Sequence, residues 1–313
     1  MSPTYSEYLR LEELLKLQTG VEGEPREISN DELHFILVHQ NFELWFKLII
    51  NELKCAIDIL SSDFVEEENL PQAVHHMERV IETFKLMSLQ WKVMETLEPQ
   101  DFLNFRDELG TASGFESFQM RKMENLMGQK WVDGKPFGKK LDSKQKSLYD
   151  VTCEWLGRTP IQGSTLALDS DESSVNDFID QYTQAHKAQY PETNQEVSDF
   201  FEVDTTTRRR RAGLLFIESY RSLPLLAWPR KLISKLIELE QAMVLWRSSH
   251  ARMVERMIGR RIGTGGSSGV DYLDMTAKFR VFIDLWLVRS ILIKKDSLPK
   301  LINPEFYEFK GNK

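Results

Sequence analysis

One stretch, residues 29–60, sets the strongest limit on the fold, because it has the pattern of a long amphipathic helix. Ser29 with Glu32 three residues later is a capping-box pattern, which is typical of a helix start. Four ring-bearing residues then fall at helical spacing on one face: Phe35, His39, Phe42 and Phe46. A helix with one apolar face has to bury that face against other elements, so the rest of the chain must supply partners.

The remaining periodicity is also helical. Amphipathic patterns predict helices at 5–18, 71–95, twice within 101–128, and at 142–157, 174–187, 194–202, 208–220 and 229–258. No segment has a convincing alternation of period two, and no internal repeat is found. The sequence therefore predicts an all-α helical bundle, formed as a single domain over residues 1–313, with a smaller helical insertion at about 130–225. The acidic, serine-rich segment 166–177 is expected to be an exposed, solvated loop.

Size and charge exclude several classes of partner. The chain has 313 residues, 41% of them hydrophobic, which is enough for a sizeable core, and a formal charge of −8. This acidic balance argues against nucleic acid or an anionic membrane as the main partner. The basic run Arg208–Arg211 is interpreted as a solvated helix start or loop. No stretch approaches the roughly 18 apolar residues of a membrane span.

Cysteine usage and the first residues indicate a compartment. Cys55 and Cys153 are the two cysteines, far apart and without CxxC spacing, so neither a zinc knuckle nor a disulfide framework is expected. The segment "MSPTYSEYLRLEELLKL" lacks the basic and apolar regions of a signal peptide. We therefore expect a cytoplasmic protein.

Two of the six histidines lie on apolar helix faces. His39 is one, and His250 is the other, on a face shared with Met243, Trp246, Met253, Val254 and Met257. A lone histidine on such a face is more often a core residue bonded to a carbonyl. However, the second face is followed by "GTGGSSG" at 263–269, whose backbone N–H groups and hydroxyls suit an anionic or zwitterionic ligand. The alternative interpretation of that segment, a flexible connection between helices, stays open.

Two familiar metal-binding patterns do not occur. The sequence contains no HExxH zinc motif and no repeated carboxylate–histidine pair of a di-iron bundle. The glycine segment is neither a P-loop nor a dinucleotide fingerprint. A single histidine on a helical wall rich in Met and Trp does suit haem, which is held by one axial imidazole in an apolar pocket.

Five separated motifs resemble the tryptophan 2,3-dioxygenase family. In chain order they are "YSEYLRLEELLKLQ", "DELHFILVHQNFELWFKLIINEL", "FLNFRDELGTASGFESFQMRKMENLMG", "WLGRTP" and "WRSSHARMVERMIGRRIGTGGSSGVDYL". They cover the N-terminal third and about the last 90 residues. The resemblance implies an all-helical, homotetrameric enzyme whose bundle encloses one haem b per subunit. It also implies insertion of O₂ across the indole C2–C3 bond of L-tryptophan, to give N-formylkynurenine.

The resemblance also implies a role for each matching residue. His250 would be the proximal ligand of the haem iron, and His39 the distal histidine that meets the indole N–H. Arg106 would bind the substrate carboxylate, where two parallel hydrogen bonds suit a guanidinium. Other substrate contacts would come from Phe35, Phe102, Thr264, Tyr5 and Tyr8, with the two tyrosines entering a neighbouring subunit's site. The haem would be lined by Trp246, Ser113, Tyr272 and Gly265.

Two alternatives remain at this point. Relatives within the haem class insert one oxygen atom into modified, for example methylated, tryptophans in secondary metabolism. A different class is a non-catalytic helical scaffold, in which both histidine faces are plain core and Arg106 makes a surface ion pair with Asp107 or Glu108.

Overall fold

The computed structural model describes residues 2–20, 27–110, 112–129, 145–263 and 269–308. Within these ranges every named element is an α-helix or a short 3-10 helix, and the β pairing is limited to an isolated bridge between Ile161 and Ser164. The predicted all-α class is therefore confirmed. No helix in the described part of the chain is long and apolar enough to span a bilayer.

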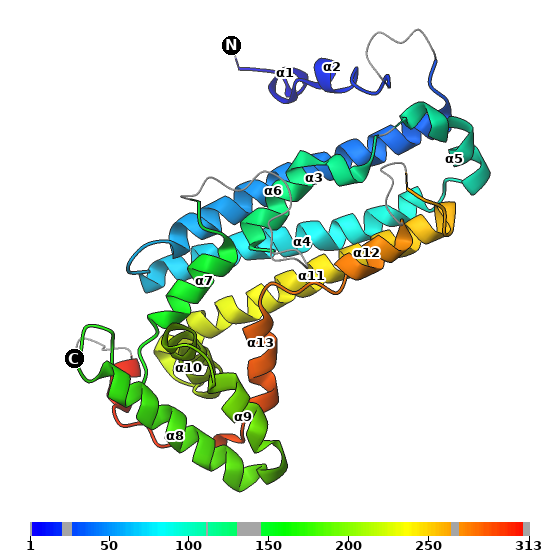
Figure 1. The fold of residues 1–313 in the computed structure, drawn as a ribbon. Coiled ribbons are helices and arrows are strands. Elements are labelled where there is room, and N and C mark those ends of the chain that lie inside the picture. Colours follow the sequence, from blue (N-terminus) through cyan, green and yellow to red (C-terminus); the bar gives the residue numbers. More distant parts are fainter. Residues whose placement is uncertain (1, 21–26, 111, 130–144, 264–268, 309–313) are drawn as a thin grey trace. The chain divides into compact units, whose positions relative to one another are not determined.

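Figure 1 labels the helices along the chain. They are α1 (Tyr5–Leu9), α2 (Leu11–Leu14), α3 (Asn30–Leu60), α4 (Leu70–Met94), α5 (Pro99–Arg106), α6 (Phe118–Met127), α7 (Leu148–Gly157), α8 (Asp171–Gln189), α9 (Asn194–Phe201), α10 (Thr205–Ser219), α11 (Ala227–Ile258), α12 (Val270–Thr276) and α13 (Ile283–Leu287).

The chain forms two compact units. Unit 1 comprises Met1–Ile49, Glu82–Met120 and Ala242–Phe279, and unit 2 comprises Ile50–Ile81, Arg121–Gln241 and Arg280–Lys313. The long helices α3, α4 and α11 each contribute residues to both units. The segment at about 130–225, expected as an insertion, falls within unit 2. The expectation of one domain over 1–313 stays a prediction.

Unit 1 is built on the first part of α3 and the parts of α4 and α11 that pack against it. The hydroxyl of Ser29 accepts the Glu32 backbone N–H at 3.1 Å, so the predicted cap does begin this helix. Phe42 and Phe46 are each 4% exposed and occupy the face predicted to be apolar. Burying one such ring contributes about 1.5–3 kcal/mol. The sequence pattern of α3 therefore directs its aromatic face into the core of unit 1.

Unit 2 packs α7 closely against α10. A Cβ atom at Gly213 of α10 would overlap the carbonyl oxygen of Leu156 in α7, so glycine permits this approach. Glu240 of α11 is fully buried and accepts the backbone N–H groups of Val281 and Phe282 and the indole N–H of Trp286. These bonds fix the start of α13 on α11.

Three expectations about local structure differ from what is observed. The helix expected at 5–18 is two short ones, because Arg10 adopts a left-handed conformation with φ 53° between α1 and α2. The segment 166–177 is not a loop throughout, since α8 begins at Asp171. That aspartate is 6% exposed and accepts from Arg209 Nε at 3.2 Å, so its charge is paired rather than solvated. Helices α12 and α13 were not predicted.

Candidate functional site

His39 lies on α3, and one of its two ring nitrogens makes a hydrogen bond. Its Nδ1 lies 2.8 Å from the carbonyl oxygen of Phe35. Because a carbonyl only accepts, Nδ1 carries the proton and the neutral ring keeps its lone pair on Nε2. Burial lowers the pKa of His39, opposed by the Phe35 bond and by the charge of Glu43. The ring is therefore a neutral acceptor at physiological pH.

His250 lies on α11 and stacks on an indole. Its imidazole is parallel to the Trp91 ring within 2°, with 4.4 Å between ring centroids, and the Trp246 centroid is 6.1 Å away. Burial, together with the nearby His39, lowers the pKa of His250 to about 3. The imidazole is therefore neutral at physiological pH and has a lone pair available for a metal ion.

A continuous aromatic cluster joins the two histidines within unit 1. The Phe42 ring centroid lies 6.5 Å from that of His39 and 4.2 Å from that of Trp91. Trp246 is 6.2 Å from Trp91 and stacks beside it. Among the described residues, neither buried indole N–H of Trp91 or Trp246 has a hydrogen-bond partner. The two histidines, predicted on separate helices, thus belong to one aromatic cluster of α3, α4 and α11, and two indole N–H donors in that cluster have no hydrogen-bond partner among the described residues.

The far side of His39 is walled by α5. The Phe35 ring, 4.0 Å from the His39 ring, is 5.8 Å from Phe102 and 5.7 Å from Phe105. Arg106 ends this helix and donates from Nη2 to the Ile262 carbonyl at 2.6 Å. That carbonyl lies directly before the glycine segment 263–269. The predicted carboxylate-binding residue is therefore hydrogen-bonded to the chain directly before the segment that the sequence singled out.

The other predicted residues are placed less closely around this cluster. Tyr5 and Tyr8 on α1 are 77% and 78% exposed. Ser113 is half-buried in the connection between α5 and α6, and Tyr272 is half-buried on α12. Thr264 and Gly265 lie outside the described residues.

Sequence reasoning missed Trp91 and Phe105, although a signal was present. Phe84, Met87, Trp91 and Met94 fall at helical spacing and are all buried on one face of α4. This face is rich in large rings and thioethers. It could have been predicted to pack against the two faces that carry the histidines. Neighbouring Gln90 donates to the Val38 carbonyl at 3.0 Å and holds α4 on α3 next to the site.

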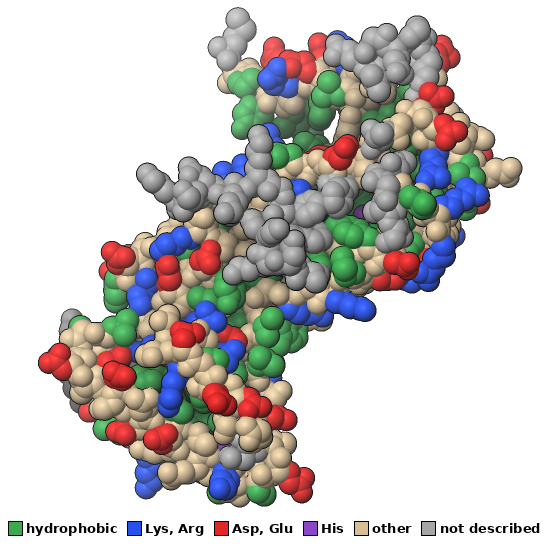
Figure 2. All heavy atoms as spheres, in the orientation of Figure 1, with side chains coloured by type: hydrophobic (Ala, Val, Ile, Leu, Met, Phe, Trp, Pro, Cys, Tyr) green, Lys and Arg blue, Asp and Glu red, His purple; other side chains and the backbone are tan. Residues whose placement is uncertain are grey.

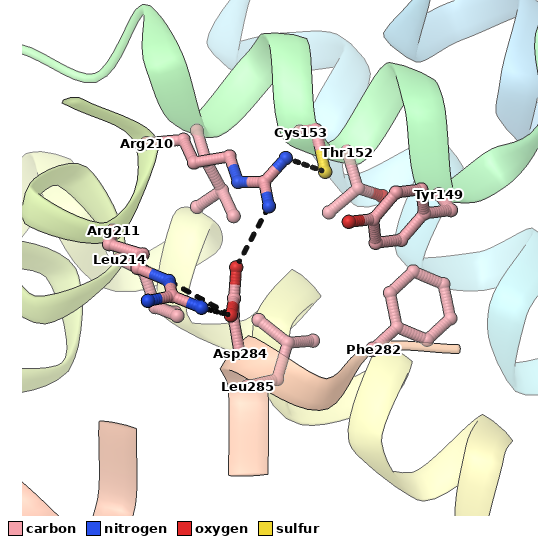
Figure 3. A pocket seen from close by; sticks show the side chains of 10 residues that line it. Tyr149, Thr152, Cys153, Arg210, Arg211, Leu214, Phe282, Asp284 and Leu285 are labelled. Atoms are coloured by element: carbon pink, nitrogen blue, oxygen red, sulfur yellow. Dashed lines mark hydrogen bonds and ion pairs between the residues drawn. The ribbon is translucent and has the colours of Figure 1, made fainter. Parts of the chain in front are cut away.

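A small pocket in unit 2 carries charged residues but offers little room (Figure 3). Arg211 donates to Asp284 from Nη2 at 2.7 Å, and Arg210 donates to the same carboxylate at 3.2 Å and to Cys153 Sγ at 3.4 Å. Burial raises the pKa of the Cys153 thiol. The cavity volume is about 20 Å³, enough for about one water. This cluster holds helices together. The run Arg208–Arg211 does lie at the start of a helix, α10, but the predicted solvated state is wrong for Arg209, Arg210 and Arg211, which pair with carboxylates.

Surface charge is mixed on the face drawn in Figure 2. Side chains of Lys and Arg alternate with those of Asp and Glu among the described residues on this face. This face therefore offers no broad single-sign surface of the kind that binds a polyanion.

The fold and the site define a class: an all-helical protein in which two neutral histidines lie in one cluster of large aromatic rings. Comparisons with known proteins identify the family within this class. The family model "Tryptophan 2,3-dioxygenase" matches residues 1–292. A tryptophan 2,3-dioxygenase of Sorangium cellulosum is 39% identical, covering 98% of this chain and 87% of the relative. Tryptophan 2,3-dioxygenase 2 of Ralstonia nicotianae is 38% identical, covering 98% and 97%. A tryptophan 2,3-dioxygenase-like protein of Xanthomonas campestris is 38% identical, covering 67% and 97%.

The chain belongs to the tryptophan 2,3-dioxygenase family and is therefore an oxygenase. The family match includes the middle segment, 130–225, which the five motifs left almost uncovered.

Proposed function

We propose that this protein inserts both atoms of O₂ across the C2–C3 bond of L-tryptophan's indole ring, giving N-formylkynurenine, and that it uses haem b. One observation carries the proposal beyond family membership. His39 and His250 come from different helices but belong to one aromatic cluster. His39 has a lone pair on Nε2, and the neutral imidazole of His250 also has a nitrogen lone pair. One imidazole is suited to a metal ion, and the other to the N–H of an indole.

The residues present fit a haem. His250 is neutral, and no hydrogen bond joins its ring to another described residue, so a nitrogen is available to iron. Among the described residues no group of three or more His, Cys, Asp or Glu could hold a metal ion, so a single protein ligand suits a metal with macrocyclic ligands. The unpartnered indole N–H groups of Trp91 and Trp246 leave donors for a bound group. When bound, haem supplies the iron centre that activates O₂.

The chain's own residues would bind and orient the substrate. Phe35 and Phe102, whose rings pack together, would give the indole an apolar wall. Nε2 of His39 would accept the indole N–H and fix the rotation of the ring. Arg106, already held by the Ile262 carbonyl, would bind the carboxylate through its remaining N–H donors. These contacts hold the ring in one orientation and exclude water, which is the protein's part of the catalysis.

We further propose a homotetramer. Leu37, Leu44 and Leu48 follow one face of α3 and are 40%, 49% and 37% exposed. Leu86, Leu89 and Val93 form a similar exposed face on α4. Repeated exposed leucines on helix faces favour association with a second copy, and exposed Tyr5 and Tyr8 are then available to a neighbouring subunit. The cytoplasmic location stays a prediction; both cysteines are free thiols in the structure.

Mass spectrometry of the product formed from L-tryptophan under isotopically labelled O₂ tests the reaction. Two label atoms in the product support ring opening, and one label atom supports the mono-oxygenase alternative. A colourless protein that takes up no haemin would favour the scaffold.

Two variants test the histidine assignments. His250→Ala should remove the axial ligand and change the haem absorption spectrum, because α11 carries no other histidine that could replace it. His39→Ala should keep the spectrum of the ligated haem and reduce turnover. An unchanged axial ligand in His250→Ala contradicts the assignment.

A further inference from the structure

Glu43 lies one helical turn after His39 on α3 and makes contacts with a distant segment. Its carboxylate accepts the Ser117 hydroxyl at 2.6 Å through Oε1 and the Gln119 amide at 2.9 Å through Oε2. The same Gln119 amide donates to the Glu43 backbone carbonyl at 2.8 Å. Three hydrogen bonds, two of them to an ionised group, therefore join this one residue to the start of α6.

The segment that Glu43 holds is a helix start. The Ser117 hydroxyl, which donates to Glu43, accepts the backbone N–H of Met120 at 3.1 Å. Ser117 therefore caps the first turn of α6 while it is fixed to α3. Glu43 is half-buried, so water competes less for its carboxylate than it would at an exposed site.

We call the hydrogen bonds of Glu43 with Ser117 and Gln119 the latch. The chain between α5 and α6 connects this latch to the phenylalanines of α5 beside His39. Residue 106 ends α5, and residue 117 precedes α6. Phe102 and Phe105 of α5 pack on Phe35, and Arg106 follows them directly. The connection has helical structure at both ends, with 3-10 helices at Asp107–Leu109 directly after α5 and at Gly114–Glu116 directly before Ser117. The position of Ser117 therefore restricts where α5 can place its last turn.

We propose that Glu43 is a positioning residue for substrate binding: by holding Ser117 and Gln119 on α3, it fixes the α5–α6 connection and, with it, the placement of Arg106 and Phe102 beside His39. This inference rests on the function proposed above, because it assigns Glu43 to that same site. Glu43 acts through other residues and does not touch the substrate.

The role predicts a specific kinetic signature. Glu43→Ala in the holoenzyme should raise KM for L-tryptophan about 10-fold, since hydrogen bonds to a charged group are lost, with a smaller change in kcat. Glu43→Gln keeps an acceptor for Ser117 and should fall between Ala and the native protein. Ser117→Ala should also raise KM, and the double variant with Glu43→Ala should be little worse than the worse single one. Asp58→Asn, an exposed carboxylate on the same helix, is the matched control and should change nothing.

Hydrogen exchange supplies a readout independent of turnover. In Glu43→Ala the backbone amides of 116–121 should exchange faster, while the backbone amides of α11 keep their protection. The haem absorption spectrum should stay native. Native KM together with native exchange in Glu43→Ala would overturn the latch and leave the proposed function standing. If the native protein does not turn over tryptophan, the proposed function fails, and unchanged exchange at 116–121 separately refutes the latch. Additive effects of Glu43→Ala and Ser117→Ala on KM would also contradict it.

Discussion

The indole of Trp91 lies flat on the imidazole of His250, with 4.4 Å between ring centroids and 2° between ring planes. The two rings come from α4 and α11, so the orientation of the histidine is set by a neighbouring helix as well as by its own. Stacking covers one face of the imidazole and leaves the ring edge, with its nitrogens, unblocked. A ring held in this way needs little reorganisation to bind a metal ion.

Replacing Trp91 should therefore affect both stability and haem uptake. Trp91→Ala removes a buried ring and is expected to lower the free energy of unfolding by about 3–5 kcal/mol. It should also weaken haemin binding, because His250 loses the surface that orients it. Trp91→Phe keeps an aromatic face and should retain most of the affinity. Urea unfolding and a haemin titration followed by absorbance measure the two effects, and equal haemin affinity in all three proteins would contradict the orienting role.

Arg106 should discriminate ligands by their carboxylate. Arg106→Ala is expected to weaken L-tryptophan binding by roughly 10- to 100-fold, the range for a lost charge-assisted hydrogen bond. Tryptamine, which lacks the carboxylate, should bind the native protein and the variant equally well. Binding is measured by the ligand-induced change in the haem spectrum, with Arg256→Ala, an exposed arginine on α11, as control. Equal losses for both ligands would place the effect of Arg106 in the fold rather than in recognition.

His186 should make the protein sensitive to acid. It is fully buried on α8, and in the described part of the chain neither ring nitrogen has a hydrogen-bond partner. Burial lowers the pKa of His186 below its ordinary value of 6.5, partly opposed by Glu196. Below about pH 6.5 the unfolded chain binds a proton that the folded protein excludes, so stability falls as the pH drops.

His186→Leu should remove this loss. The variant is expected to be about 1–3 kcal/mol more stable at pH 7, the cost of an unpaired buried polar group, and to have a flatter profile between pH 7 and pH 5. Chemical unfolding at several pH values tests this, with His75→Gln, an exposed histidine, as control. A variant as acid-sensitive as the native protein would show that other groups dominate.

Asp284 should matter more than its single charge indicates. It pairs with Arg210 and Arg211, and its side chain is 18% exposed. Asp284→Ala leaves two half-buried guanidinium groups without their carboxylate and should cost on the order of 3 kcal/mol of unfolding free energy. Glu82, whose side chain is 70% exposed, pairs with Lys85, and Glu82→Gln should cost close to nothing. Similar small losses in both variants would mean that the arginines find other partners.

The sequence predicted the elements of the site better than their mutual contacts. Helical spacing placed His39 and His250 on apolar faces, because a helix repeats its face whatever it packs against. The same reasoning could not find the stack of Trp91 on His250, since periodicity says which face is buried and not which ring it meets. The prediction that the arginine run is solvated was wrong for a related reason. Its partners, Asp171 and Asp284, lie far away in sequence. The left-handed Arg10 was also hidden, because arginine carries no local signal for that conformation.

The main-chain bond at Phe35 has a consequence for how specificity in this pocket can change. The proton on His39 is directed to Nδ1 by a backbone carbonyl, which every amino acid supplies, so substitutions at position 35 reshape the wall without altering the tautomer. New ligands would thus be selected around a constant acceptor. An indole methylated on nitrogen has no hydrogen to donate to Nε2, so we expect it to bind less tightly than L-tryptophan while His39 is present.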